Sequence, residues 1–304
     1  MIKNFEEVLK KVKEHEMKKV AVAVAQDEPV LEAIRDAKLK GIADAVLVGD
    51  KEEIIKIAAK IGMNLEGVEI VDEPDVRKAA LKAVELVSSG YADMVMKGLV
   101  DTATFLKSVL NKEVGLRTGR LMSHVAVFEI PGFDRLLFLT DVAFNMYPEL
   151  KDKVDIINNA VKVAKAVGVE TPKVVPVCAV EVVNPNMPAT LDAALLTKMN
   201  ERGQIKDCII DGPLALDNAI SEEACAHKGI GGPVAGKADI LLLPNIDAGN
   251  IMYKTLTYTT NSKNGCVLVG TSAPVVLTSR ADSYETKMYS IALASLVAKD
   301  KVRK

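Results

Sequence analysis

The chain has 304 residues, of which 39 are Lys or Arg, 41 are Asp or Glu and 49% are apolar. At about 100–200 residues per domain, this length predicts two domains with their own cores, which excludes disordered and fibrous proteins. The net charge of −2 and the 4% aromatic content without Trp disfavour nucleic-acid binding, so an anionic ligand needs a local cluster of basic groups.

The first third of the chain alternates helical and strand patterns. Helices are predicted over 4–17, 29–40, 51–62 and 74–90, and short strands over 20–25, 45–49, 68–72 and 92–98. These strands are apolar on both faces, which is typical of parallel strands that helices cover on each side. We therefore expect an α/β architecture.

The pattern changes near 115–120, where antiparallel strands enter. Segments 125–130 and 135–141 are separated by only four residues, which predicts a hairpin. No linker of low complexity follows, so we expect two closely packed α/β lobes with a ligand cleft between them. The later elements are helices over 148–167 and 189–202, strands over 173–180, 207–212 and 238–246, a helix through 252, strands over 266–270 and 274–278, and a final helix.

A glycine-rich segment matches nucleotide-binding motifs only in part. Gly231, Gly236 and Lys237 satisfy G-x-x-x-x-G-K, but Ala238 replaces the hydroxyl that binds magnesium, and a strand follows instead of a helix. Val234 stands where a dinucleotide fingerprint needs its third glycine. The segment is either a plain loop, in which we place His227, or one whose N–H groups approach an anionic ligand.

The N-terminus and the cysteines indicate a soluble protein of the cytoplasm. The first 19 residues mix charged and apolar types, unlike a secretory signal, and no stretch approaches the roughly 20 apolar residues that cross a bilayer. Cysteines 178, 208, 225 and 266 form no Cys-x-x-Cys pair, and the three histidines form no ligand cluster. We expect reduced, buried thiols and no metal site.

Polar residues follow four predicted strands, where α/β folds bind their ligands. Taken singly, each group is explained as a turn or helix cap, but four groups in one chain favour a shared site. The groups are Lys97, Asp101, Thr102 and Thr104; Thr140, Asp141 and Asn145; Asp211 and Asp217; and Asp247, Gly249 and Asn250.

A fifth group follows the strand at 274–278. Ser279 and Arg280 lie in a turn, and a helix is predicted to start near Ser283 with Glu285 in its first turn. Hydroxyls, a guanidinium and helix N-terminal amides together form a good phosphate receptor. The plain alternative is a helix cap followed by a solvated charge.

Arg117 and Arg120 add positive charge to the candidate phosphate receptor. Both lie in the short segment GLRTGR, between the two halves of the chain. The plain alternative for this pair is a solvated turn between domains.

Four long segments resemble the phosphate acetyltransferase and phosphate butyryltransferase family. They are TDVAFNMYPE, DGPLALDNAIS, GPVAGKADILLLPNIDAGNIMYK and VGTSAPVVLTSRADS, in this order. The resemblance covers essentially the whole chain. It implies a two-domain, three-layer α/β/α subunit of the isocitrate/isopropylmalate dehydrogenase-like type, with an interdomain cleft. Domain 1 would comprise 1–117 and 263–304, and domain 2 would comprise 118–262.

The resemblance also implies an activity. A short-chain acyl-CoA, with butyryl-CoA expected, and phosphate would be converted reversibly to acyl phosphate and CoA by direct transfer in a ternary complex. Coenzyme A is then a substrate, and no tightly bound cofactor or metal is expected. The family is usually oligomeric, so we expect a homo-oligomer, as a dimer or larger, without nucleic-acid or membrane partners.

The resemblance carries over to individual residues. The family's Ser-Arg pair at the cleft matches Ser279 and Arg280, and these two with Glu285 are the predicted catalytic residues. The predicted substrate- and phosphate-binding residues are Lys97, Thr102, Thr104, Arg117, Arg120, Asp211 and Asn250.

One position departs from the family pattern. Many acetyl-specific members carry an Asp six residues beyond the Arg, as a proposed base for the CoA thiol, but Thr286 occupies this position. Either Glu285 or Asp282 replaces it, or the thiol is activated in a different way. Three alternatives stay open: a phosphate acetyltransferase, a dehydrogenase of the isopropylmalate type, and a non-catalytic CoA-binding protein.

Overall fold

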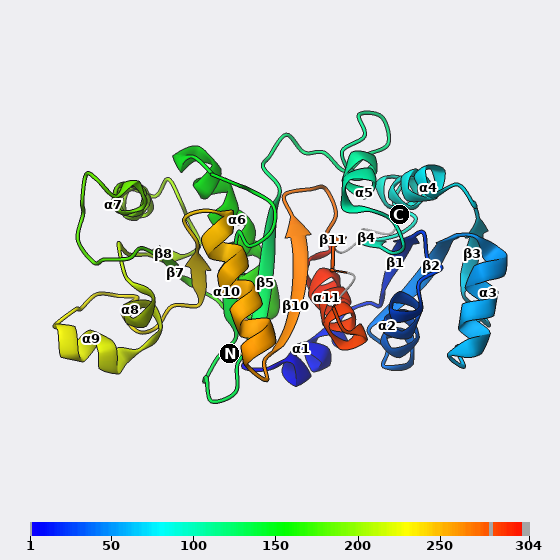
Figure 1. Cartoon of the computed structure of the whole chain (residues 1–304), viewed down its shortest axis with the longest axis horizontal. Helices are drawn as coiled ribbons and strands as arrows, with labels where there is room; N and C mark the ends of the chain where they lie inside the picture. The colour runs from blue at the N-terminus through cyan, green and yellow to red at the C-terminus, as the bar shows by residue number, and fades with distance from the viewer. Residues whose placement is uncertain (1, 280–281, 300–304) are drawn as a thin grey trace. The chain divides into compact units, whose positions relative to one another are not determined.

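The computed structural model describes residues 2–279 and 282–299, which form two compact units (Figure 1). Unit 1 comprises the residues up to Asn4 together with Leu121–Asn264. Unit 2 comprises Phe5–Arg120 and the chain from Gly265 onward. The domain limits expected from the sequence stay a prediction.

Unit 2 is built on strands in the order β3-β2-β1-β4-β11-β10. β1 to β4 are parallel, as predicted, and β11 is parallel to β4 and antiparallel to β10. The C-terminal part of the chain therefore completes the sheet that the first part begins. The strands are Lys18–Ala23 (β1), Ala43–Gly49 (β2), Glu69–Asp72 (β3), Met94–Lys97 (β4), Lys263–Val269 (β10) and Val275–Val276 (β11).

The helices of unit 2 begin where the sequence places Asp or Ser before the first turn. Side-chain oxygens of these residues accept first-turn N–H groups at the start of α2 to α5 and α11. In Figure 1, α4 and α5 pack together on one side of the strands, and α2 and α11 pack together on the other. The helices are Phe5–Val12 (α1), Glu28–Leu39 (α2), Lys51–Lys60 (α3), Val76–Ser88 (α4), Thr102–Val109 (α5) and Tyr284–Val297 (α11).

The first helix is shorter than the sequence pattern predicts. It ends at Val12, and the N–H groups of Lys13, Glu14 and His15 donate to carbonyls three residues back. Residues 13–17 are all exposed. Since packing of an apolar face supplies most helix stability in a protein, the charged segment beyond Val12 gains little from staying helical.

Unit 1 carries strands in the order β5-β6-β9-β7-β8. β5 and β6 are antiparallel, which confirms the predicted hairpin, and β6, β9, β7 and β8 are parallel. The strands are Ser123–Glu129 (β5), Leu137–Thr140 (β6), Lys173–Pro176 (β7), Ile209–Ile210 (β8) and Ile240–Leu242 (β9). The helices are Leu150–Val167 (α6), Pro188–Glu201 (α7), Leu216–Ile220 (α8), Glu222–Lys228 (α9) and Ile246–Thr259 (α10).

The glycine-rich segment begins later than the sequence pattern predicts. His227 lies in the last turn of α9, which Ser221 caps at its start and Gly229 ends in the left-handed conformation. A helix of seven residues is too short to show a helical repeat, so the pattern missed it.

Large apolar side chains fill the core of each unit. Phe5 and Phe105 in unit 2, and Phe128 and Phe138 in unit 1, are fully buried. Within the part of the chain that the structure describes, no helix is both long enough and apolar enough to cross a membrane.

Candidate active site

The carboxyl ends of β1 and β4 in unit 2 are joined by main-chain hydrogen bonds. The N–H of Gly98 donates to Ala23 O (2.8 Å), and the N–H of Leu99 donates to Val24 O (2.7 Å). A Cβ at Gly98 would lie 2.3 Å from Val24 O, so only glycine permits this close approach. The loops that follow the two strands are therefore held together at one edge of the sheet, where ligands of α/β proteins bind.

Lys97 ends β4 at this edge and is buried. Its Nζ donates to the carbonyls of Gly98 (3.3 Å) and Val100 (3.0 Å), so the side chain braces the loop that leads into α5. Its role in phosphate binding stays a prediction.

Thr102 and Thr104 lie in the first turn of α5. The carboxylate of Asp101 caps this helix by accepting the N–H of Thr104 (2.8 Å), and this bond is the main reason why the pKa of Asp101 is lowered. Thr102 is exposed, whereas Thr104 lines a surface cavity of about 300 Å³ between α4 and α5 together with Arg77 and Lys107. The two threonines thus have different surroundings.

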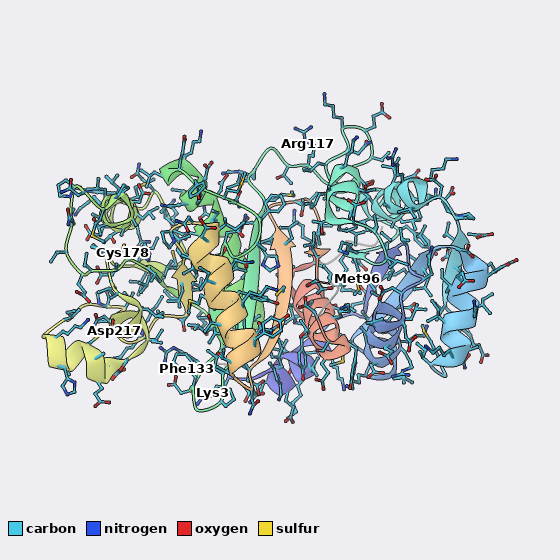
Figure 2. The ribbon with its side chains drawn as sticks, viewed as in Figure 1. Lys3, Met96, Arg117, Phe133, Cys178 and Asp217 are labelled. Carbon is cyan, nitrogen blue, oxygen red and sulfur yellow. The ribbon has the colours of Figure 1, made fainter. Side chains whose placement is uncertain are left out.

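Arg117 and Arg120 are exposed on the loop after α5, on which Figure 2 labels Arg117. Thr118 Oγ1 donates to Gly270 O (2.5 Å), and the N–H of Ser272 donates to Leu116 O (2.9 Å). These bonds join the arginine-bearing loop to the loop after β10. Both arginines stay predicted phosphate ligands.

The turn after β11 contains Ser279. The N–H of Ser279 donates to Asp282 Oδ2 (2.6 Å), and Lys287 Nζ donates to the carbonyls of Ser279 (3.2 Å) and Asp282 (2.6 Å). The turn is therefore held both by its own carboxylate and by a lysine from α11. Arg280, the other residue of the predicted pair, lies outside the described residues.

Lys287 on α11 contacts this turn, and the sequence analysis missed it. It is only 3% exposed, and burial lowers its pKa, while the carboxylates of Asp282 and Asp27 oppose this effect. The sequence could have indicated Lys287, because this lysine shares the buried face of its helix with Ile291, one turn further on. A lysine on an apolar face needs polar partners inside the protein.

The start of α11 shows what Thr286 does in place of a carboxylate. Ser283 caps the helix, its Oγ accepts the N–H of Thr286 (3.1 Å), and the two hydroxyl groups lie 3.2 Å apart. Glu285 is exposed in the first turn, and its carboxylate has no hydrogen-bond or ion-pair partner among the described residues. Thr286 thus supports the cap, and the role of Glu285 as a proton acceptor stays a prediction.

In unit 1, Asp211 follows β8 and lies against the glycine-rich loop. A Cβ on Gly232 would come within 2.5 Å of Asp211 Oδ2, and the φ of 127° at Gly232 favours glycine, so the loop passes close to the carboxylate. Burial raises the pKa of Asp211, and the N–H of Gly212 opposes the rise. The glycine-rich loop therefore lies next to the carboxylate of Asp211 at Gly232.

Asn250 lies on α10 and connects this helix to the turn after β6. Its Nδ2 donates to Val142 O (3.2 Å), and a Cβ at Gly249 would come within 2.2 Å of Asp141 O. The structure thus gives Asn250 a bracing contact, and its role toward substrate stays a prediction.

Asp141 is the centre of that turn. Its buried carboxylate accepts hydrogen bonds from four main-chain N–H groups and one side-chain amide, so the protein itself supplies the partners of this carboxylate. The donors are the N–H groups of His124, Ala143, Phe144 and Asn145, and Nδ2 of Asn145. Among the described residues, no group of three or more His, Cys, Asp or Glu side chains has a metal-binding arrangement.

Comparison with known proteins decides the family. Residues 4–80 and 73–295 match the family described as Phosphate acetyl/butaryl transferase. The chain belongs to this family. It is 75% identical over 301 residues to the phosphate butyryltransferase of Clostridium acetobutylicum, covering 99% of this chain and 100% of that protein. It is 50% identical to the phosphate acetyltransferase of Thermotoga maritima, covering 92% and 95%.

Solved structures confirm the fold predicted for this phosphate acetyl/butaryl transferase. A branched-chain phosphotransacylase from Enterococcus faecalis V583 has a TM-score of 0.82 and 35% identity, covering 93% of this chain and 100% of that one. A chain described as a 4-hydroxythreonine-4-phosphate dehydrogenase from Salmonella typhimurium has a TM-score of 0.54 and 17% identity, covering 93% and 100%. The second likeness concerns the fold alone.

Proposed function

We propose that this chain is a phosphate butyryltransferase that converts butyryl-CoA and phosphate reversibly to butyryl phosphate and CoA. The observation that carries the proposal is the 75% identity, over the full length of both chains, with the enzyme of that name from Clostridium acetobutylicum. The dehydrogenase alternative shares only a fold, at 17% identity.

The reaction is a direct acyl transfer between two bound substrates. A phosphate oxygen attacks the thioester carbonyl, the C–S bond breaks, and the departing CoA thiolate takes up a proton. In reverse, a base removes the thiol proton, the sulfur attacks the acyl phosphate, and the C–O bond to phosphate breaks. No protein nucleophile is needed, because orienting the two reactants already supplies part of the rate enhancement.

The Ser279 turn and the start of α11 carry the proposed catalytic residues. Ser279 donates a hydrogen bond to the phosphate or to the developing oxyanion, Arg280 neutralises the phosphate, and Glu285 exchanges the thiol proton. The exposure of Glu285 and the absence of a described partner for it support this assignment. The bonds from Lys287 support a fixed position for Ser279.

The remaining predicted residues are assigned to substrate binding. Lys97, Arg117, Arg120, Thr102 and Thr104 would contribute positive charge and donors from unit 2. Asp211 and Asn250 would contribute polar contacts from unit 1. Because Lys97 and Asn250 also brace loops, substitutions there will affect structure as well as binding.

A phosphate acetyltransferase is the second candidate. The 50% identity with the Thermotoga maritima enzyme favours it, although less strongly than the 75% identity favours the butyryl enzyme. The two candidates differ only in the acyl chain, so kinetics decides between them.

The deciding experiment follows CoA release with a thiol reagent, using acyl-CoA substrates from two to six carbons with and without phosphate. We expect phosphate-dependent release that is fastest with butyryl-CoA, with and without a metal chelator. Fastest release with acetyl-CoA would support the second candidate. Binding of CoA without turnover would instead identify a non-catalytic CoA-binding protein.

We also propose that the enzyme works in the cytoplasm as a homo-oligomer, most simply a dimer, with CoA as a substrate and no tightly bound cofactor. Light scattering after size-exclusion chromatography would give a mass of twice the 32.7 kDa chain. A mass of one chain at assay concentrations would overturn the dimer.

A further inference from the structure

Helix α10 of unit 1 buries one of its sides in the core of the unit. The ring of Tyr253 packs edge-on against Phe128 of β5, with 5.5 Å between the ring centroids. Gly249, one turn earlier, lies directly against the main chain of Asp141. In Figure 1 the helix, drawn in orange, lies in front of the strands of unit 1. One side of α10 is thus fixed by the core, and the residues opposite to it face away from the sheet.

Four residues form a single stripe on this opposite side. Asp247, Ile251, Lys254 and Tyr258 follow one another at steps of four, three and four residues. These steps place them on one face of an α-helix, over a length of about 16 Å. Ile251 and Tyr258 are 66% and 67% exposed. Alternate steps of four and three residues are also the spacing at which two packed helices contact one another.

Further apolar surface continues the stripe at the start of the helix. Met146 and Tyr147 are 68% and 74% exposed. The N–H of Ile246 donates to Met146 O (2.9 Å), and the hydroxyl of Tyr147 donates to Asp247 Oδ2 (3.2 Å), so the fold holds both residues beside α10. Single exposed apolar residues are usual, but a connected group marks an interaction site. We call this group the α10 face, and its members are Met146, Tyr147, Asp247, Ile251, Lys254 and Tyr258.

The two charged residues of the α10 face stand at different points along the helix. Asp247 lies in the first turn, where its carboxylate accepts the hydroxyl of Tyr147. Lys254 lies two turns further on, and its Nζ is 5.7 Å and 5.6 Å from the ring centroids of Tyr253 and Tyr258. Among the described residues, neither side chain has an ion-pair partner. Both charges are therefore available to a partner outside the chain.

The order of these charges fits a second copy of the same face. In a two-fold pair of antiparallel α10 helices whose axis passes beside Ile251, each Asp247 faces Lys254 of the partner subunit. The two Ile251 side chains meet at the axis, and Tyr258 reaches the apolar group at the start of the partner helix. A parallel pair would instead place the two Asp247 carboxylates together, which repel one another. The α10 face is therefore complementary to itself in the antiparallel direction.

We propose that the α10 face binds a second copy of this chain, with the two α10 helices antiparallel across a two-fold axis near Ile251. The inference rests on the homo-oligomer proposed above, and it adds the surface and the direction of the contact. A helix face is convex, so it suits a macromolecule and not a small molecule, which binds in a concave site. Among macromolecules, the self-complementary order of charges favours the same chain.

The first test introduces a charge at the proposed axis. Light scattering after size-exclusion chromatography gives the mass of the full chain in solution, and the wild type should have at least twice the 32.7 kDa of one chain. Ile251→Asp should have half the wild-type mass or less at the same concentration, because two carboxylates then meet in an apolar contact. Leu39→Asp is the matched control and should keep the wild-type mass, since Leu39 is 79% exposed at the end of α2 in unit 2.

Two outcomes of the mass measurement would overturn the proposal. One is a folded Ile251→Asp protein with the wild-type mass. The other is a wild-type protein with the mass of one chain at assay concentrations.

The second test determines the direction of pairing. Asp247→Lys and Lys254→Asp, made separately, each place like charges in contact twice in a pair, so each should raise the dissociation constant about tenfold or more. An equimolar mixture of the two variants should associate as the wild type does, because both contacts then join opposite charges. Sedimentation velocity over a dilution series measures these constants. A mixture that associates no better than its components would overturn the antiparallel pair.

These tests separate the inference from the proposed activity. If the variants behave as expected while the wild type shows no phosphate-dependent release of CoA, the proposed activity fails and the α10 face stands. If the wild type turns over butyryl-CoA and Ile251→Asp keeps the wild-type mass, only the assignment of the α10 face fails. Should Ile251→Asp not fold, which urea unfolding would show, the charge variants decide alone.

Discussion

The buried side chains of Lys287 in unit 2 and Lys153 in unit 1 are held in different ways. Lys287 in unit 2 is 3% exposed and donates to two main-chain carbonyls, whereas Lys153 in unit 1 is 5% exposed and pairs with the carboxylate of Asp192. Carbonyl dipoles satisfy an ammonium group without cancelling its charge, but a carboxylate cancels it. The comparison indicates that unit 2 directs positive charge toward the Ser279 turn, while Asp192 cancels the charge of Lys153 in unit 1.

The largest effect is expected for Arg280→Ala, which tests whether the edge of unit 2 binds phosphate. A guanidinium beside the Ser279 turn would stabilise phosphate in the transition state, so kcat/KM should fall about 10³-fold and the KM for phosphate should rise. Arg280→Lys is the control, because it keeps the charge and loses the bidentate geometry. Unchanged kinetics in both directions would remove Arg280 from the site.

The second prediction concerns the ion pair between Lys153 and Asp192 in unit 1. Asp192→Ala leaves the ammonium of Lys153 buried without its partner and should lower the free energy of unfolding by about 3 kcal/mol in urea titrations. The double variant Lys153→Met/Asp192→Leu should recover most of this loss. Glu85→Ala, which breaks the exposed pair with Lys82, is the control and should have a much smaller effect. Equal losses of unfolding free energy in Asp192→Ala and Glu85→Ala would show that the Lys153–Asp192 pair is not buried in solution.

The third prediction concerns the proton acceptor at the start of α11. With acyl phosphate and CoA as substrates, Glu285→Gln should lower kcat about 10²-fold at pH 6.5, and the deficit should shrink as the pH rises toward the pKa of the CoA thiol, where the thiol ionises without help. Glu285→Asp should retain part of the activity. A pH profile that matches the wild type would assign thiol activation to another residue.

The smallest effect is expected for Lys287→Met, which leaves the carbonyls of Ser279 and Asp282 without their donor. We expect kcat to fall about tenfold, because misplacing a substrate-positioning turn slows the reaction. Arginine at 287 is the conservative control, since it can donate to the same carbonyls.

The pH dependence of stability gives Lys287→Met a second readout. Burial lowers the folded-state pKa of Lys287 below its ordinary value of 10.5, so between the two values the unfolded chain binds more protons. Wild-type stability therefore gains a contribution as pH rises through this window, and Lys287→Met lacks it. Parallel urea-unfolding curves for both proteins from pH 7 to 10 would contradict a buried, carbonyl-bound ammonium.

Local patterns in the sequence predict most of the fold, because they report on neighbours along the chain. The sequence segments that form β1, β2 and β4 are apolar on both faces. In the structure these strands are parallel, as expected of strands that helices cover on each side. The four residues after Ile130 predicted the hairpin of β5 and β6, which the structure confirms. The helix α9 was missed because seven residues show too little of a repeat.

The candidate site is less accessible to such patterns, because its contacts join distant segments. Thr118 and Gly270, which join the arginine-bearing loop to the loop after β10, are 152 residues apart, and nothing in either neighbourhood indicates the other. The sequence did place Ser279 and Glu285 at a strand end and a helix start, as the structure has them. Their roles in catalysis depend on substrates and stay predictions.

The pairing of β11 with β4 has a consequence for how the protein is made. Val275 and Val95 are neighbours in the sheet, so unit 2 cannot close until almost the whole chain has left the ribosome. Nearly all of unit 1, from Leu121 to Asn264, is synthesised before β11. During translation, the N-terminal strands must therefore wait with an open sheet edge, which is the stage at which a chaperone would be most useful.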